Sequence, residues 1–268
     1  MIDSDTLKKD TIVSKKHSKF KISLDYSSNN TYKGKKDTNN LPIITPFVKY
    51  TTKSRFFISS SLVHSSLTGK VFDELDLGVG KKIRFSNRWD GSISYSHFFF
   101  DSKVSRVKSS VMNDLSSYLG FDSDILYSQL YFDWTQGNKK SKKKNSAGTT
   151  NDFIFTFTNS HQFVFDDVFT SGDDITIIPT VDILYGTQNF LATYKGKKDI
   201  AYKSYQDQAS KFALTSYIFT LYLSYQIKNF VFNVSPYYTI PKNLPAGEST
   251  SPYFVMSAGI YYTFISKK

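Results

Sequence analysis

His64, Ser65 and Ser66 place an imidazole base beside two hydroxyl groups, the side chains that a serine nucleophile and its activating base require. Such a nucleophile also needs a third group that orients the base, and the sequence supplies no matching Asn for that role. A thiol nucleophile and a disulfide are excluded because the 268-residue chain has no cysteine. We therefore interpret the segment as a histidine and serines at the end of a loop.

The remaining candidates for metal or phosphate chemistry are isolated along the chain. His17, His97 and His161 show no spacing of a metal-binding pair, and no Gly-rich phosphate loop is present. The acidic pairs Asp166–Asp167 and Asp173–Asp174 could bind calcium, but both lie beside predicted turns, so we interpret them as solvated acidic turns. These residues predict no metal, no other cofactor and no enzymatic activity.

The composition is basic and aromatic. Lys and Arg number 34 against 23 Asp and Glu, the formal charge is +11, and there are 19 Tyr and 24 Phe. The lysines gather at 33–36, 139–144 and 195–198, where they are typical of solvated loop tips, and no nucleic-acid-binding motif accompanies them. We therefore expect no nucleic-acid partner. The sequence has no run of 18 apolar residues, so it predicts no transmembrane helix.

The elements that must position any site are strands, as the last one shows most clearly. From Pro252 to Phe264 the even positions are apolar, and the odd positions are largely small or polar. This alternation predicts a strand with one apolar face. The same period recurs in twelve segments, whose approximate ranges are 19–27, 42–51, 55–64, 71–85, 92–101, 114–121, 125–136, 152–165, 174–186, 211–226, 230–240 and 252–264. We interpret 152–165 as one long strand rather than a hairpin.

Tight turns and longer polar loops alternate between these strands, as a barrel with short periplasmic turns and long outer loops requires. In lipid every backbone donor must be paired, and strands achieve this only by closing the sheet. The sequence therefore predicts an antiparallel transmembrane β-barrel of about twelve strands over residues 17–265, after a polar tail at 1–16. That tail lacks the apolar core of a secretory signal, so we expect the signal to have been removed.

Strand parity predicts which side chains face the lumen. The inward charges are of both signs, and they are Lys49, Glu74, Asp76, Lys82, Arg84, Asp114, Asp133 and Asp182. Tyrosines on the same faces would also fill a barrel of this size. We therefore expect a narrow or occluded lumen in which Glu74, Asp76, Lys82 and Arg84 form one mixed-charge network.

Three polar side chains fall on faces that parity assigns to lipid, namely His97, Asn159 and His161. Polar groups at membrane depth are costly, so their presence needs a reason. We expect local bulges that redirect them, and the alternative is contact with a partner protein.

The ending Ser257-x-Gly259-x-x-Tyr262-x-Phe264 resembles the C-terminal signal by which outer-membrane β-barrels are handed to their assembly machinery. Together with the strand rhythm, the Lys- and Asn-rich loops and the segments 235–238 and 241–243, it is similar to outer-membrane barrels of Bacteroidota-type bacteria. The resemblance implies a bacterial outer-membrane location, contact with outer-membrane lipid and lipopolysaccharide, and recognition by the barrel assembly machinery. It implies no specific activity.

Three functions remain open for such a barrel: a structural or accessory subunit of an outer-membrane complex, a small-solute porin, and a lipid-active enzyme. The enzyme alternative rests on a similarity in size and strand number to outer-membrane phospholipase A. That family carries its nucleophile in a His-x-Ser-Asn-Gly context, whereas this chain has Leu67 and Thr68 before Gly69. A soluble β-sandwich adhesin is the alternative outside the membrane.

Overall fold

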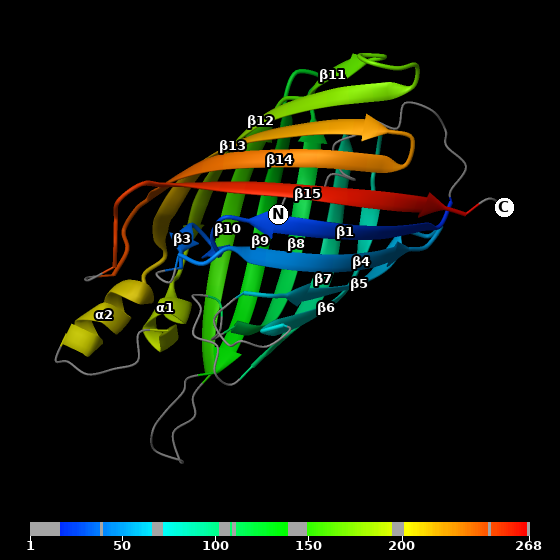
Figure 1. The fold of residues 1–268 in the computed structure, drawn as a ribbon. Helices are drawn as coiled ribbons and strands as arrows, with labels where there is room; N and C mark the ends of the chain where they lie inside the picture. Colours follow the sequence, from blue (N-terminus) through cyan, green and yellow to red (C-terminus); the bar gives the residue numbers. More distant parts are fainter. Residues whose placement is uncertain are drawn as a thin grey trace.

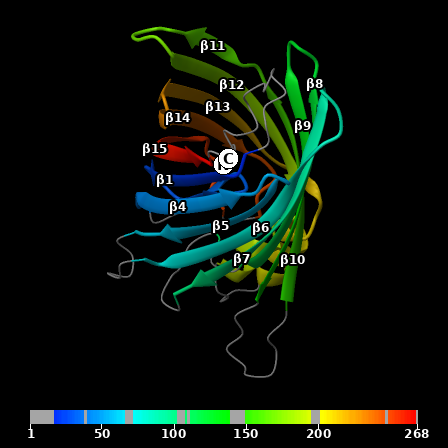
Figure 2. The same ribbon diagram turned by 90° about the vertical axis from the view of Figure 1, so that its right-hand side faces the viewer.

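The strands of the computed structural model close into one antiparallel barrel (Figures 1 and 2). The structure describes residues 17–37, 40–65, 72–101, 108, 111–138, 149–194, 201–245 and 248–266. The predicted polar tail, 1–16, lies outside the described residues. The wall strands are β1 (Lys19–Ser27), β4 (Ile43–Thr51), β5 (Phe56–Val63), β6 (Glu74–Arg84), β7 (Trp89–Phe100), β8 (Val111–Asp122), β9 (Tyr127–Asn138), β10 (Thr149–Ser160), β12 (Asp173–Gly186), β13 (Ala213–Ile227), β14 (Phe230–Pro241) and β15 (Tyr253–Ile265).

Each wall strand pairs with its neighbours in sequence, β1 pairs with β15, and the pairing of β10 with β12 completes the ring. The predicted twelve-stranded antiparallel barrel is therefore confirmed. Most predicted strand bounds differ from the observed ones by one to three residues. At β7, for example, the strand begins at Trp89, three residues before the predicted range.

β11 (Phe163–Asp166) continues β10 rather than forming a separate wall strand. Ser160 pairs with Thr180 and Phe163 pairs with Ile177, so the ladder keeps one register across the gap. The gap lies opposite Pro179, which has no N–H to donate to the ladder, while its carbonyl oxygen still accepts from the His161 N–H at 3.3 Å. Residues 152–165 thus follow a single strand path, as the uniform parity of their phenylalanines predicted.

Apolar side chains cover the outside of this barrel. On β1, for example, Phe20, Ile22 and Leu24 are 39%, 39% and 50% exposed, whereas the alternate residues face inward. The same period continues round the wall, so far more large apolar side chains are exposed than buried in the described part of the chain. A contiguous apolar surface of this extent is typical of contact with lipid rather than water.

The two ends of the barrel differ. At the turn end, the chain crosses between strands in the short connections 52–55, 85–88, 123–126, 167–172 and 228–229, and β1 begins and β15 ends there. The longer connections 28–42, 64–73, 101–110, 139–148, 187–212 and 242–252 lie at the loop end. The lysine-rich segments 139–144 and 195–198, which follow β9 and α1 in the chain, lie outside the described residues. Left-handed backbone at Arg55, Asp124 and Lys228 (φ 66°, 70° and 54°) allows the tight reversals.

The loop end also carries the small elements. A two-stranded hairpin, β2 (Thr31–Tyr32) and β3 (Lys35–Lys36), interrupts the first long connection, and helices α1 (Asn189–Tyr194) and α2 (Ala201–Ala209) lie between β12 and β13. Neither helix is long and apolar enough to cross a membrane. The hairpin and the helices pack with β7 and β8 in an apolar cluster of buried residues, which consists of Tyr32, Phe98, Val111, Phe190, Leu191, Tyr205 and Ala209.

Candidate functional site: a lumen entered by its own loops

Carboxylates line the loop-end half of the inner wall. They come from five strands and comprise Glu74, Asp76, Asp114, Asp133, Asp152 and Asp182, which we call the acidic wall. Strand parity places them inward because their sequence neighbours carry the lipid-facing side chains. Unpaired carboxylates at this depth would lose hydration without compensation, so the acidic wall requires cations or hydrogen-bond donors.

The first cation comes from the β2–β3 hairpin. Lys33 and Gly34 have φ values of 48° and 79°, which form the two-residue turn at its tip. Lys33 Nζ lies 2.5 Å from Asp133 Oδ2, and Ser116 Oγ lies 2.5 Å from the other oxygen of that carboxylate. Gly34 is needed for space as well as conformation, because a Cβ there would lie 2.2 Å from Ser216 Oγ.

The hairpin therefore crosses the lumen. It leaves the wall between β1 and β4, and β9 is six steps from β1 in the ring of twelve, through β4, β5, β6, β7, β8 and β9. On its other flank Thr31 Oγ1 hydrogen-bonds to the Tyr237 hydroxyl of β14 at 2.7 Å. Burial alone would lower the pKa of Lys33, but Asp133 and Asp114 more than reverse this, so the pKa lies above its usual 10.5.

A second cation enters from the β7–β8 loop. Lys108 Nζ lies 2.7 Å from Glu74 Oε1 and 3.5 Å from Asp76 Oδ2. The same ammonium lies 3.5 Å from the centre of the Phe98 ring. Burial alone would lower the pKa of Lys108, but the negative charges of Glu74 and Asp76 have the larger effect, so the pKa is raised above 10.5.

The hairpin is also fixed to the outer loops. Lys35 Nζ lies 2.5 Å from Glu248 Oε2, with the two side chains only 5% and 1% exposed. The Tyr205 hydroxyl of α2 donates to Glu248 Oε1 at 2.8 Å, and the rings of Tyr32 and Phe190 meet edge to face at 5.0 Å. Charge pairing and apolar packing thus connect the hairpin, both helices and the β14–β15 loop.

Two members of the acidic wall have other partners. Asp152 caps α1, accepting the backbone N–H groups of Asn189 at 2.6 Å and Phe190 at 2.9 Å. Asp182 accepts a 2.5 Å hydrogen bond from Thr158 Oγ1. Asp152 therefore fixes the start of α1 to β10 at the loop end.

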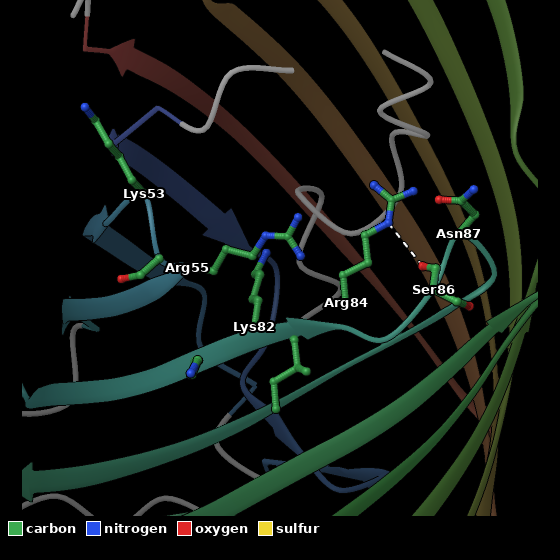
Figure 3. Close-up of a pocket in the computed structure, with 9 residues that line it drawn as sticks. Lys53, Arg55, Lys82, Arg84, Ser86 and Asn87 are labelled. Atoms are coloured by element: carbon green, nitrogen blue, oxygen red, sulfur yellow. Dashed lines mark hydrogen bonds between the residues drawn. The ribbon is translucent and has the colours of Figure 1, made fainter. Parts of the chain in front are cut away.

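The eight charges predicted to face the lumen do not form one network. Glu74 and Asp76 pair with Lys108, whereas Lys82 and Arg84 lie at the turn end of the same strand. At about 3.3 Å per residue, Asp76 and Lys82 are separated by about 20 Å along β6. The predicted network of these four residues is therefore wrong. Lys82 and Arg84 instead line a separate pocket at the turn end (Figure 3), and Lys49, also near that end, lies 4.4 Å from the Phe57 ring.

The interpretation of 33–36 as a solvated loop tip is also wrong, because Lys35 is buried and Lys33 reaches the acidic wall. Sequence reasoning missed Lys33, Lys35, Lys108, Asp152 and Glu248 as functional residues. The one available signal was the Lys33-Gly34 pair, a tight-turn dipeptide inside a connection otherwise interpreted as a loop.

The polar residues on the outer face pair within the wall. His97 Nδ1 and the Tyr95 hydroxyl each lie 2.7 Å from Asn113 Oδ1, and Asn113 Nδ2 donates to Gln136 at 3.0 Å. The β6–β7 ladder passes His97 without a register shift, and the nearest irregularity lies on β8. The predicted bulge at His97 is therefore wrong.

At the turn end, Asn159 Oδ1 accepts from Ser128 Oγ at 2.7 Å, and His161 Nδ1 bonds to the Ile125 carbonyl. The β10–β12 ladder keeps its register here also, so a bulge is wrong at this second place too. Cross-strand hydrogen bonds, rather than redirected side chains, satisfy these groups.

The residues of the proposed assembly signal occupy both faces of β15. Gly259 faces inward, where a Cβ would lie 2.4 Å from Asp25 Oδ1, and Ser257 lies on the same face with its Oγ 3.2 Å from that of Ser27. Tyr262 and Phe264 face outward at the turn end, with ring centres 4.5 Å apart.

Of the candidate catalytic segment 64–66, Ser66 lies outside the described residues. Ser65 Oγ donates directly to Asp73 at 2.6 Å, and its backbone N–H donates to the same oxygen at 2.7 Å. His64 Nδ1 is buried without a hydrogen-bond partner among the described residues. Within those residues, no three His, Asp or Glu side chains form a metal site.

The acidic pair 173–174 is not a solvated turn, because both side chains are buried. Asp173 organises the β11–β12 turn by accepting the N–H groups of Val168 and Thr170 at 2.7 and 2.9 Å, and the Tyr225 hydroxyl at 2.9 Å.

Comparison with known proteins finds similarity only in three dimensions. No family model and no curated sequence matches the chain. Among solved structures, a KdgM porin matches with a TM-score of 0.52 at 12% identity, covering 91% of this chain and 99% of the porin. LpxR from Salmonella typhimurium matches with a TM-score of 0.51 at 9% identity, covering 91% and 100%. The chain therefore has the fold of outer-membrane β-barrels.

Proposed function

We propose that this chain is an integral β-barrel of a bacterial outer membrane, acting as a structural or accessory subunit whose lumen is closed from the loop end. Its apolar outer surface and closed sheet support the location, since both suit a lipid environment. Aromatic side chains at the turn end form a girdle. The ring centres of Trp89 and Phe121 lie 4.7 Å apart there, and those of Phe230 and Tyr262 lie 4.5 Å apart.

The closed lumen rests on one observation above all: the Lys33–Asp133 ion pair. It joins a hairpin that leaves one side of the barrel to the strand opposite, so the chain itself crosses the lumen. Lys108 supports the same proposal, because it brings a second loop onto the inner wall. Withdrawing either lysine would leave a buried carboxylate without its counter-charge, which is energetically costly. These loops should therefore remain in place.

The proposed partners follow from the surface and from the last strand. Outer-membrane lipid and lipopolysaccharide would contact the apolar wall, and the barrel assembly machinery would recognise Ser257, Gly259, Tyr262 and Phe264. The outer-face group of Tyr95, His97, Asn113 and Gln136 is the surface that we propose for contact with another outer-membrane protein. The proposal assigns no catalysis to the barrel, consistent with the direct bonding of Ser65 to Asp73.

Single-channel recording in planar bilayers tests the proposal. We expect the wild-type protein to show no steady, porin-like conductance. Lys33→Gln/Lys108→Gln removes both loop cations and should produce frequent openings. The matched control, Lys211→Gln/Lys228→Asn, removes two exposed lysines and should remain closed. A large steady conductance of the wild type would overturn the closed lumen and support the porin alternative.

A further inference from the structure

Five basic residues line a pocket of about 420 Å³ at the turn end (Figure 3), and one of them, Lys81, has its Nζ 4.7 Å from the centre of the Phe56 ring. Lys53 and Arg55 come from the β4–β5 turn, and Lys82 and Arg84 are among the last residues of strand β6. We call these four residues the basic rim. Ser54, Ser86 and Asn87 complete the polar lining. The pocket lies at the opposite end of the barrel from Lys33 and Lys108, so its chemistry is separate from that of the loops.

Backbone geometry holds two of these cations together. Arg55 is directly opposite Lys82, because the Lys82 N–H donates to the Arg55 carbonyl at 3.0 Å. The left-handed φ of Arg55, 66°, is fixed by a 2.9 Å bond from its own N–H to the Thr52 carbonyl. Arg84 follows two residues after Lys82 and so shares its face of β6. Figure 3 shows the side chains of Arg55 and Lys82 extending into the same space.

Lys53, Arg55 and Arg84 bring three positive charges to this one pocket. In the described part of the chain, none of Lys53, Arg55 and Arg84 takes part in an ion pair. Asp90 is paired with Arg84 across the strands, but its carboxylate accepts the Tyr127 hydroxyl at 2.7 Å, while Arg84 Nε donates to the Ser86 carbonyl at 3.2 Å.

We infer that the basic rim binds an anion with at least two negative charges on phosphate or carboxylate groups. Two guanidinium groups can hold such oxygens through paired hydrogen bonds, and the lysines add point charges. A volume of about 420 Å³ suits a small phosphorylated molecule or a phospholipid headgroup. The anion would approach from the turn end. The inference does not depend on whether the loop end is closed.

Titration calorimetry of the full-length barrel in zwitterionic detergent at low salt, with inorganic pyrophosphate as the probe, tests a soluble source. We expect saturable binding to the wild type and an affinity lower by about tenfold or more in Arg55→Gln/Arg84→Gln, because charge-assisted bonds are lost. The control Arg88→Gln/Lys228→Asn removes the same charge at the same end and should change the affinity less than about twofold. An equal loss of affinity in the control would show that only the net charge of this end matters, and it would overturn the proposed site.

Native mass spectrometry tests a lipid source. The barrel is extracted from bilayers containing either cardiolipin, whose headgroup carries two phosphates, or phosphatidylcholine, and retained lipid is counted. Selective retention of cardiolipin by the wild type but not by the Arg55/Arg84 variant would assign the site to a headgroup. Absence of wild-type binding in both experiments overturns the inference. If Arg55→Gln fails to fold, Lys82→Gln/Arg84→Gln replaces it, since both positions lie on regular β6.

Discussion

Lys33 and Asp133 are one hundred residues apart in the chain, yet their Nζ and Oδ2 atoms lie 2.5 Å apart across the barrel. The lysine is at the tip of a loop-end hairpin, and the aspartate is on the opposite wall. Because both side chains are largely shielded from solvent, the pair is weakly screened by salt. This contact determines how the loop end should behave in experiments.

Alkaline pH should release the loops. The pKa values of Lys33 and Lys108 are raised in the folded state, so their contribution to loop stability is complete below about pH 10.5 and is lost as the pH rises through the folded-state pKa. We expect channel openings to increase only above that pH. Bilayer recordings between pH 7 and 11 test this. Openings that begin near neutral pH would contradict the assigned ion pairs.

The buried pair of Lys35 and Glu248 should dominate the stability of the outer loops. Glu248→Ala leaves a buried ammonium, which costs about 3–5 kcal/mol. Amide exchange in the β2–β3 hairpin and α2 should therefore accelerate on the order of a hundredfold or more, as measured by mass spectrometry.

Two further variants separate burial from charge pairing. Lys35→Met/Glu248→Gln removes both charges but keeps an oxygen for the Tyr205 hydroxyl, so exchange should largely return to the wild-type rate. Asp124→Asn breaks the exposed Arg88–Asp124 pair, whose side chains are 62% and 57% exposed, while keeping a residue that tolerates the left-handed φ of 70°, and should cost less than about 1 kcal/mol. If the Glu248→Ala and Asp124 variants have equal effects on amide exchange in the hairpin, the structural role assigned to Lys35 is wrong.

Replacing Tyr262 and Phe264 by Ala should impair assembly, because the substitution removes the proposed recognition aromatics and part of the turn-end girdle. Membrane levels and heat-modifiable migration on gels measure the effect. The control Phe254→Ala/Met256→Ala removes two outward apolar side chains of the same strand, 57% and 43% exposed, outside the signal. Normal levels of the Tyr262/Phe264 variant would remove the main support for the assembly route.

Single cysteines can establish the orientation, since the chain has none of its own. Lys211→Cys is at the loop end and Asn229→Cys is at the turn end, and both positions are exposed. With the loop end outside the cell, an impermeant thiol reagent on intact cells should label position 211 and not 229. The reverse pattern would invert the barrel in the membrane.

The sequence by itself determined the strands, their number and the face that each residue occupies. The reason is local: side chains of a strand alternate between two environments, so Phe20 and Ile22 against Lys21 and Ser23 already distinguish lipid from lumen. Loop lengths are equally local, and they separated the two ends of the barrel. Even the path of 152–165 followed from the constant parity of Phe153, Phe155, Phe163 and Phe165.

Only the tertiary structure decided which charges meet. Parity places Glu74, Asp76, Lys82 and Arg84 on one face, but it carries no information about their partners across the lumen, and five residues of strand separate Asp76 from Lys82. The paths of the loops decide the rest. Lys33 and Lys108 reach the acidic wall because the closed ring puts β9 opposite β1 and brings the β7–β8 loop over β6. Such contacts depend on ring closure and strand register, which join residues far apart in sequence, so no local pattern could reveal them.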